Sequence, residues 1–308
     1  MMQLSQINIF PVKSLDGYSP KTAVVERRGL RHDRRWLIVD ADGVFMTQRT
    51  NGRMALLRAQ VIDDAVLTLS EKGNPNNSIK IDLKKGGNTE GSPLLLPPST
   101  GLRGEMTVQI WDDRVLAALV SPQADAFLSD FLNKKCHLVS MPPTTERRLE
   151  EKYNTGDDIV SFADAYPFLI LGEATMQDLN NKIAARHAEN VPNQFPITIN
   201  QSPTNPLSIR RFRANFIFSG GAPFAEDAFK NFKIGDVDFV VLKPCARCVL
   251  TTRDPDTGQK GKEPLETLAT YRQRGTKILF GQNLIFNADR WQWAALPEVS
   301  VGDVLSLD

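Results

Sequence analysis

The stretch that decides the fold class is "RRWLIVDADGVFMTQR", residues 34–49. Two apolar runs flank Asp42-Gly43, and an Asp-Gly pair between such runs is the strongest short-range signal for a β-hairpin. The alternation of apolar and polar residues continues in "QINIF" (6–10), "AQVIDDAVLTL" (59–69), "SIKIDL" (78–83) and "MTVQIWDDRVLAALV" (106–120). Residues 1–120 therefore predict a small, mostly antiparallel, barrel-like β domain, interrupted by a flexible loop over residues 84–98.

The remainder, residues 121–308, predicts a second β-rich domain with helices at its rim. Ser121 caps a helix that starts at Pro122, and its apolar stripe must pack on a sheet. Cys136 follows as ordinary core material, and the polar segment 142–158 is expected to be an exposed crossover. A second helix is expected over 172–186. Strands are expected in 212–220, 237–244, 248–254, 277–286 and 301–308. The predicted fold class is mostly β with some α.

Composition excludes several classes of protein. With 37 basic and 36 acidic side chains the net charge is +1, so no overall field attracts nucleic acid or an anionic membrane. The N-terminus lacks a signal-peptide pattern and no window approaches eighteen apolar residues, which favours the cytoplasm. Three cysteines form no disulfide framework and suit a reducing compartment.

Two of those cysteines lie in "KPCARCVLTTRDPDTG", residues 243–258. A zinc site needs a second pair of ligands, and the remaining candidate soft ligands are Cys136 and three histidines that are scattered along the chain. A thioredoxin-like redox pair precedes a helix, whereas "VLTT" favours a strand. Two cysteines packed as small apolar residues are the plain alternative. Arg247 and Lys243 favour a thiolate instead, because a neighbouring cation stabilises the ionised thiol, which is a ligand for soft metals.

Basic residues elsewhere repeat a pattern of anion binding, although each cluster alone is most often a solvated face. They are Lys13 with Ser14, Arg34 with Arg35, Thr47 with Arg49, and the run "RRFRANF" (210–216). In that run, strand alternation would put Arg211, Arg213 and Asn215 on one face, which suits an anion or a planar polar heterocycle.

Several longer motifs resemble those of a known protein family. "PVKSLDG" (11–17) and "LRHDRRWLIVDADGVFMTQR" (30–49) resemble the N-terminal β-barrel domain that precedes MOSC domains. "DAYPFLILGEATMQDLN" (164–180), "FRANFIFSGGAPFAEDAF" (212–229), "CARCVLTTRDPDTG" (245–258), "KEPLETLATYR" (262–272) and "FGQNL" (280–284) resemble the MOSC domain of the mitochondrial amidoxime reducing component and its bacterial relatives.

The resemblance implies a molybdenum–molybdopterin cofactor with Cys248 as protein ligand to the metal and Cys245 as a neighbour. It implies cofactor-binding roles for Lys13, Ser14, Arg34, Arg213, Asn215 and the backbone around Ala246 and Arg247, to which the basic Arg49 and Arg211 are added as candidates. Asp164 matches an acidic residue near the metal and is a catalytic candidate as a proton relay, if burial raises its pKa. The chain departs from the family at Ala165-Tyr166 and at Gly172. The protein is also expected to lack the membrane anchor of the mitochondrial members and a cysteine-bearing ferredoxin-like domain.

These inferences favour a molybdenum-dependent reductase of N-hydroxylated compounds such as amidoximes, hydroxylamines and N-hydroxylated bases. Cys248 would be catalytic, and electrons would come from a separate ferredoxin-like or cytochrome b5-like donor. One alternative is a protein that binds molybdenum cofactor, or carries sulfur, without turning over a small substrate. Another is a zinc-stabilised or metal-free β-rich interaction module.

Overall fold

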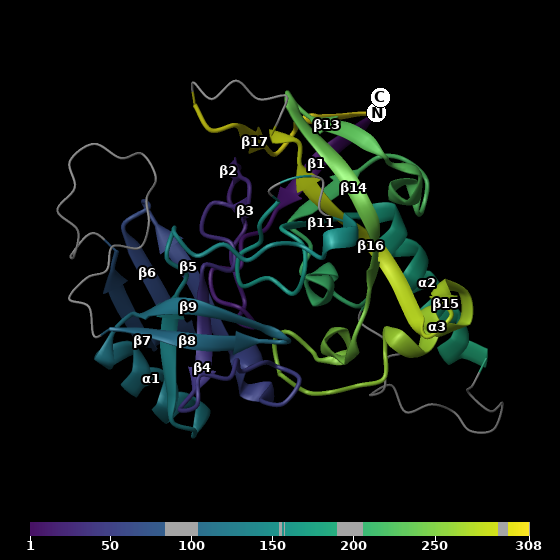
Figure 1. Cartoon of the computed structure of the whole chain (residues 1–308). Helices are drawn as coiled ribbons and strands as arrows, with labels where there is room; N and C mark the ends of the chain where they lie inside the picture. Colours follow the sequence, from purple (N-terminus) through teal and green to yellow (C-terminus); the bar gives the residue numbers. More distant parts are fainter. Residues whose placement is uncertain (84–103, 154–155, 157, 190–205, 289–294, 308) are drawn as a thin grey trace, which may run out of the picture.

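The mostly β fold is confirmed by a computed structural model that describes residues 1–83, 104–153, 156, 158–189, 206–288 and 295–307. The expected flexible loop at 84–98 lies outside the described residues. Two β-rich halves lie side by side, one built mainly from the purple-to-blue part of the chain and the other from the green-to-yellow part (Figure 1). No helix among the described residues is both long and apolar enough to cross a membrane.

The C-terminal half is a closed barrel. Its strands, in order, are β11 (Phe168–Gly172), β12 (Phe216–Ser219), β1 (Met2–Ile7), β18 (Val304–Leu307), β13 (Asn231–Ile234), β14 (Val237–Ala246) and β16 (Lys277–Phe286). β11 pairs with both β12 and β16, and this double pairing closes the sheet. The short β15 (Gln273–Arg274) extends β16. Because β1 belongs to this barrel, the first residues of the chain pack among the last. The division at residue 120 stays a prediction.

Aromatic side chains fill the barrel. The rings of Phe168, Phe216 and Phe239 pack with centroids 5.2–5.7 Å apart, in stacked and edge-on pairs. All three are at most 1% exposed, and such pairs add to the free energy gained from burial alone. The barrel core is therefore a rigid support for whatever its strand ends carry.

The N-terminal half contains small antiparallel sheets. The largest is β4 (Trp36–Asp40), β10 (Cys136–Ser140), β9 (Asp113–Leu119) and β8 (Glu105–Ile110); the other is β5 (Leu57–Ile62), β6 (Val66–Glu71) and β7 (Asn74–Asp82). A further small sheet of β17 (Glu298–Ser300), β2 (Thr22–Glu26) and β3 (Gly29–Leu30) packs its buried side chains on the barrel core. The second arm of the predicted 34–49 hairpin is not a continuous strand. Its Val44 and Phe45 form isolated bridges to β8 and β4 respectively, and so join the two edges of the largest sheet.

Three α-helices are found in the described part of the chain: α1 (Pro122–Leu132), α2 (Glu173–Glu189) and α3 (Leu265–Arg272). The predicted cap of α1 is confirmed, because the Ser121 side chain accepts a hydrogen bond from the Ala124 amide. The apolar face of α1 packs against residues of β4–β7 and β10, including Cys136, which is 1% exposed. Helices α2 and α3 lie beside the barrel, with apolar side chains packed on β11, β12 and β16.

Three local predictions are wrong. The expected strand at 248–254 is a short 3-10 helix over Val249–Thr252. The expected strand at 212–220 begins only at Phe216, after a 3-10 helix over Ile209–Phe212 and a left-handed Arg213. The expected exposed crossover at 142–158 includes Arg147, which is 6% exposed. In each case tertiary contacts described below override the local pattern. The remaining 3-10 helices are Gly52–Leu56, Glu151–Tyr153 and Ala225–Ala228.

Gly281 in β16 should be the most sensitive glycine of the barrel closure. Its φ is +79°, and a Cβ there would lie 2.9 Å from the carbonyl oxygen of Ile170 in β11. We expect Gly281→Ala to lower the free energy of unfolding by about 3 kcal/mol, because backbone must shift in addition to the left-handed strain. Urea denaturation measures the change.

The matched control is Gly275→Ala. Gly275 also has positive φ (+57°), but nothing lies within 4 Å of its Cβ position, so only the conformational cost of about 1 kcal/mol is expected. Equal losses at the two positions would contradict the role given to the β11–β16 contact.

Candidate active site

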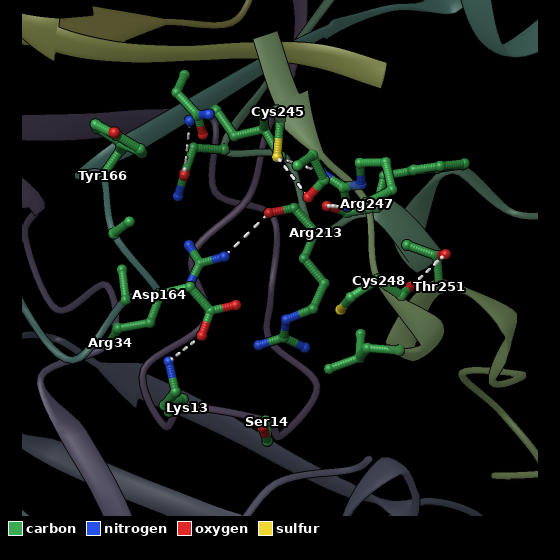
Figure 2. Close-up of a pocket in the computed structure, with 18 of the residues that line it drawn as sticks. Lys13, Ser14, Arg34, Asp164, Tyr166, Arg213, Cys245, Arg247, Cys248 and Thr251 are labelled. Atoms are coloured by element: carbon green, nitrogen blue, oxygen red, sulfur yellow. Dashed lines mark hydrogen bonds and ion pairs between the residues drawn. The ribbon is translucent and has the colours of Figure 1, made fainter. Parts of the chain in front are cut away.

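A cavity of about 260 Å³ is lined by residues from both halves and contains both cysteines of residues 243–258. The N-terminal half contributes Lys13, Ser14, Arg34, Thr47 and Arg49; the rest of the chain contributes Ala163, Asp164, Ala165, Tyr166, Phe168, Leu169, Phe212, Arg213, Asn215, Lys243, Cys245, Ala246, Arg247, Cys248, Leu250, Thr251 and Asn283. Figure 2 shows the cationic side chains and the Cys248 thiol converging on this space. All but one of the predicted site residues line it.

Lys13 and Asp164 form an ion pair in the wall. The Lys13 ammonium donates to Asp164 Oδ1 at 2.6 Å and to the carbonyl of Phe162 at 2.8 Å. Burial lowers the pKa of Lys13 to about 8, although Asp164 opposes this. Burial would raise the pKa of Asp164, but the charge and hydrogen bond of Lys13, with Arg49 and Trp111, hold it well below its usual range. The condition set for the expected proton relay, a raised pKa of Asp164, is therefore not met, and a catalytic role of Asp164 stays a prediction.

Two guanidinium groups stand close together on the same ring. Arg34 and Arg213 lie 4.6 and 4.2 Å from the centroid of Phe10, and Arg34 Nη2 donates to the Arg213 carbonyl at 3.0 Å. Arg34 is paired with the fully buried Asp33, whereas Arg213 Nη2 is buried without a hydrogen-bond partner among the described residues. Burial and the charge of Arg34 lower the pKa of Arg213. An anion placed here would relieve both costs.

The two cysteines have different surroundings. Cys248 is exposed, and its carbonyl accepts hydrogen bonds from the amide and the hydroxyl of Thr251, at 3.1 and 2.9 Å. Cys245 is partly buried, and its sulfur lies 2.9 Å from Arg247 Nη1. The basic residue between the cysteines therefore contacts the first thiol and leaves the second open to the cavity.

The backbone of several cavity residues is left-handed. Ser14, Arg34 and Arg213 have φ of 65°, 50° and 54°. Residues other than glycine and asparagine rarely adopt such values. Such strain clusters at functional sites, where the surrounding structure enforces it. The positive φ of Arg213 also explains why the predicted strand does not start before Phe216.

The other predicted site residues differ in how far their polar groups are already hydrogen-bonded within the protein. Arg211 is the one that lies away from the cavity: it donates to Asp254 at 2.8 Å and supports the turn after Cys248. The Asn215 amide is committed to backbone, donating to the carbonyl of Asn8 and accepting from the amide of Leu169. The backbone amide of Arg247 donates to Ile278. Arg49 extends to Asp164 Oδ2 at 3.4 Å.

No group of three or more His, Cys, Asp or Glu side chains within metal-binding reach occurs in the described ranges. The thiol of Cys248 lies in a cavity where the charged lining residues that the structure describes are cations, apart from Asp164.

Two family models match this chain. A model described as the MOSC N-terminal beta barrel domain matches residues 1–135, and one described as the MOSC domain matches residues 157–306.

Among curated proteins, mitochondrial amidoxime-reducing component 1 of Mus musculus is 31% identical, over 99% of this chain and 82% of its own length. The human protein of the same name is 30% identical, over 92% and 76%. The chain belongs to the MOSC-domain family. Molybdenum cofactor sulfurase of Oryza sativa subsp. japonica is 27% identical over 91% of this chain, which spans only 32% of the sulfurase. Among solved structures, a Bordetella bronchiseptica protein covers 35% of this chain and 72% of its own with 16% identity and a TM-score of 0.27.

Sequence reasoning missed one positioning residue of this MOSC site. Arg147 donates to the carbonyls of Ser161, Ala163 and Asp164 at 3.1, 2.5 and 2.9 Å, and through Nε to Asp113 Oδ2 at 2.6 Å. It thereby fixes the segment that ends in Asp164. Its surroundings in sequence, "TTERRLEEK", are those of an exposed segment, so nothing local distinguishes it.

The pKa of Lys13 predicts a pH-dependent stability. In the unfolded chain Lys13 regains its ordinary pKa of 10.5, whereas in the folded MOSC protein it is about 8. Between these values the unfolded state binds the extra proton, so stability rises with pH. Wild-type protein, compared with Lys13→Met, should gain up to about 3 kcal/mol of unfolding free energy from pH 8 to pH 10.5.

Urea denaturation at several pH values measures this difference. Lys80→Met, on an exposed part of β7, is the control for removing a lysine charge. A difference between wild type and Lys13→Met that stays flat or falls over this range would contradict the burial of Lys13.

Proposed function

We propose that this protein is a molybdenum-cofactor-dependent reductase of N-hydroxylated compounds, such as amidoximes, hydroxylamines and N-hydroxylated bases. Cys248 would be the protein ligand of the metal. The observation that carries the proposal is an exposed thiol in the wall of a cavity that is also lined by Arg213, which has an unpartnered, buried guanidinium nitrogen. That combination suits a ligand with a soft metal at one end and an anion at the other.

The residues fit a phosphorylated pterin. Arg34 and Arg213, crowded on Phe10, supply two positive charges for the phosphate, and Ser14 adds a buried hydroxyl group. Lys13 commits its ammonium group to Asp164 and to a backbone carbonyl, so it acts through charge and by ordering the wall. When bound, the cofactor supplies the two-electron redox chemistry.

The side chains of the protein would bind and orient the substrate and hold the protons that the reaction needs. Asp164, ionised and held by Lys13 and Arg49, is suited to accept a hydrogen bond from an N–OH or N–H group. Reduction of the N–O bond consumes two electrons and two protons and releases water. Lys13 Nζ, with a pKa of about 8, is the group in the wall whose proton can exchange near neutral pH.

Electrons would come from a separate donor protein of ferredoxin or cytochrome b5 type, and a cytoplasmic location is part of the proposal. Coverage favours a reductase over a cofactor-binding or sulfur-carrier protein: the chain spans 82% of the mouse amidoxime-reducing component and 32% of the rice sulfurase.

Cys248→Ser should abolish the reductase activity. The protein is produced in a host that supplies molybdenum cofactor, and amidoxime reduction is measured with an artificial reductant. Molybdenum is quantified in the same samples. Loss of the thiolate should lower the rate at least 100-fold while the protein stays folded, because Cys248 is exposed and its substitution leaves no cavity.

Cys245→Ser is the matched control, since Cys245 lines the same cavity and its sulfur contacts Arg247. It should retain molybdenum and most activity. Full activity in Cys248→Ser would refute the assignment. Wild-type protein that holds molybdenum but reduces no N-hydroxylated compound would support the cofactor-carrier alternative, and protein that holds zinc or no metal would support the interaction module.

A further inference from the structure

Trp111 has a backbone conformation that its side chain disfavours. It is the first of two residues at the tip of the β8–β9 hairpin, and its φ is 53°. Glycine and asparagine normally occupy such positions, and a bulky residue with positive φ is an outlier. Strain of this kind persists where the surrounding structure enforces it, and it points to a role outside folding.

The Trp111 side chain is also exposed where burial would be expected. The residue is 39% exposed, and its indole packs edge-on against Phe45 with ring centroids 4.9 Å apart. The guanidinium of Arg49 lies 4.4 Å from its ring centroid. A planar cation on an indole gives a flat, partly desolvated surface.

The same residues connect Trp111 with the cavity. Indole Nε1 donates to Asp164 Oδ1 at 3.3 Å, and Arg49 Nη2 donates to Oδ2 of the same carboxylate at 3.4 Å. Arg49 and Asp164 both line the cavity, and the Asp164 side chain is 58% exposed. Trp111 therefore stands at the rim, directly beside the carboxylate.

Two contacts hold the hairpin tip there. Residues 43–45 run along β8: the Gln109 amide donates to Gly43, and the Phe45 amide donates to Gln109. Arg147 joins Asp113, two residues after Trp111, to the backbone of Asp164. Figure 1 shows β8 and β9 running from the N-terminal half toward the C-terminal half. These contacts position the tip through backbone hydrogen bonds and the buried charge of Arg147, and the Trp111 side chain remains 39% exposed.

We propose that Trp111, stacked with Arg49, is a substrate-binding platform that favours substrates whose N–O group is conjugated to a planar aromatic or heteroaromatic ring. The ring stacks on the platform, and the N-hydroxylated end reaches Asp164 and the space in front of Cys248. This inference rests on the proposed function and deepens it by naming the residue that selects the substrate.

The test compares an aromatic and an aliphatic amidoxime as substrates of the molybdenum-loaded protein with an artificial reductant. In Trp111→Gly the ratio of kcat/KM for the aromatic over the aliphatic substrate should fall about tenfold, mainly through KM, as expected for one lost stacking contact. Trp111→Phe should restore most of the ratio. Calorimetric binding of the aromatic amidoxime to resting protein should weaken by the same factor.

Asp63→Gly is the matched control. Asp63 is exposed at the tip of the β5–β6 hairpin with φ of 50°, so glycine relieves the same strain away from the cavity, and both kcat/KM values should stay unchanged. An equal loss on both substrates in Trp111→Gly, or no loss, would overturn the proposal. A loss of activity that appears only when a protein electron donor replaces the artificial reductant would also overturn it, because Trp111 would then belong to a docking surface for that donor.

If wild-type protein reduces neither substrate, the proposed function fails, and the binding measurement alone decides the platform. Weaker binding of the aromatic compound in Trp111→Gly than in Asp63→Gly would then support it. Equal binding would refute it.

Discussion

The pairing of β11 with β16 is the constraint on which the site depends. It closes the barrel and removes the free edges that an open sheet would expose. It also requires Gly281, where the two backbones approach too closely for a side chain. Once β16 is fixed, β14 must follow it through two irregular steps, at Val241/Lys243 and Pro244/Ala246. The strand β14 carries Cys245 and ends at Ala246, two residues before Cys248, and both cysteines line the cavity.

Charge distribution is the second organising feature. Around the cavity several cations have an acidic partner: Lys13 and Arg49 share Asp164, Arg34 pairs with Asp33, and Lys243 pairs with Glu150. Arg213 and Arg247 form no ion pair within the described residues: Arg213 donates to the carbonyl of Leu15, and Arg247 donates to the carbonyl of Phe212 and to Cys245 Sγ. The cavity therefore holds guanidinium groups without an acidic partner together with the exposed Cys248 thiol. This arrangement offers an anion-binding group and a soft ligand within one cavity.

Much of the fold could be predicted from the spacing of apolar residues and from the residues that start and end helices and turns. Alternation predicted strand structure over residues 106–120, where β8 and β9 are found, and Ser121 with Pro122 predicted the start of α1. The failures occur where distant contacts decide: Arg213 is left-handed because it must cap a 3-10 helix and face Phe10, and Arg147 is buried because three carbonyls of 161–164 need a donor. Site prediction relied on family motifs, which located most cavity residues. They could not reveal that Lys13 keeps Asp164 ionised, since that depends on a 2.6 Å contact between residues 151 positions apart.

The left-handed residues have a consequence for engineering. Replacing a residue of positive φ by glycine or asparagine is a common route to higher stability. At Asn133, the C-cap of α1 with φ of 50°, the chain already uses such a residue. At Ser14, Arg34 and Arg213 the same substitution would relax the backbone and delete a group that faces the cavity. A library selected only for thermal resistance would therefore drift toward proteins that melt later and bind less, and the sites of that drift can be read from the φ angles alone.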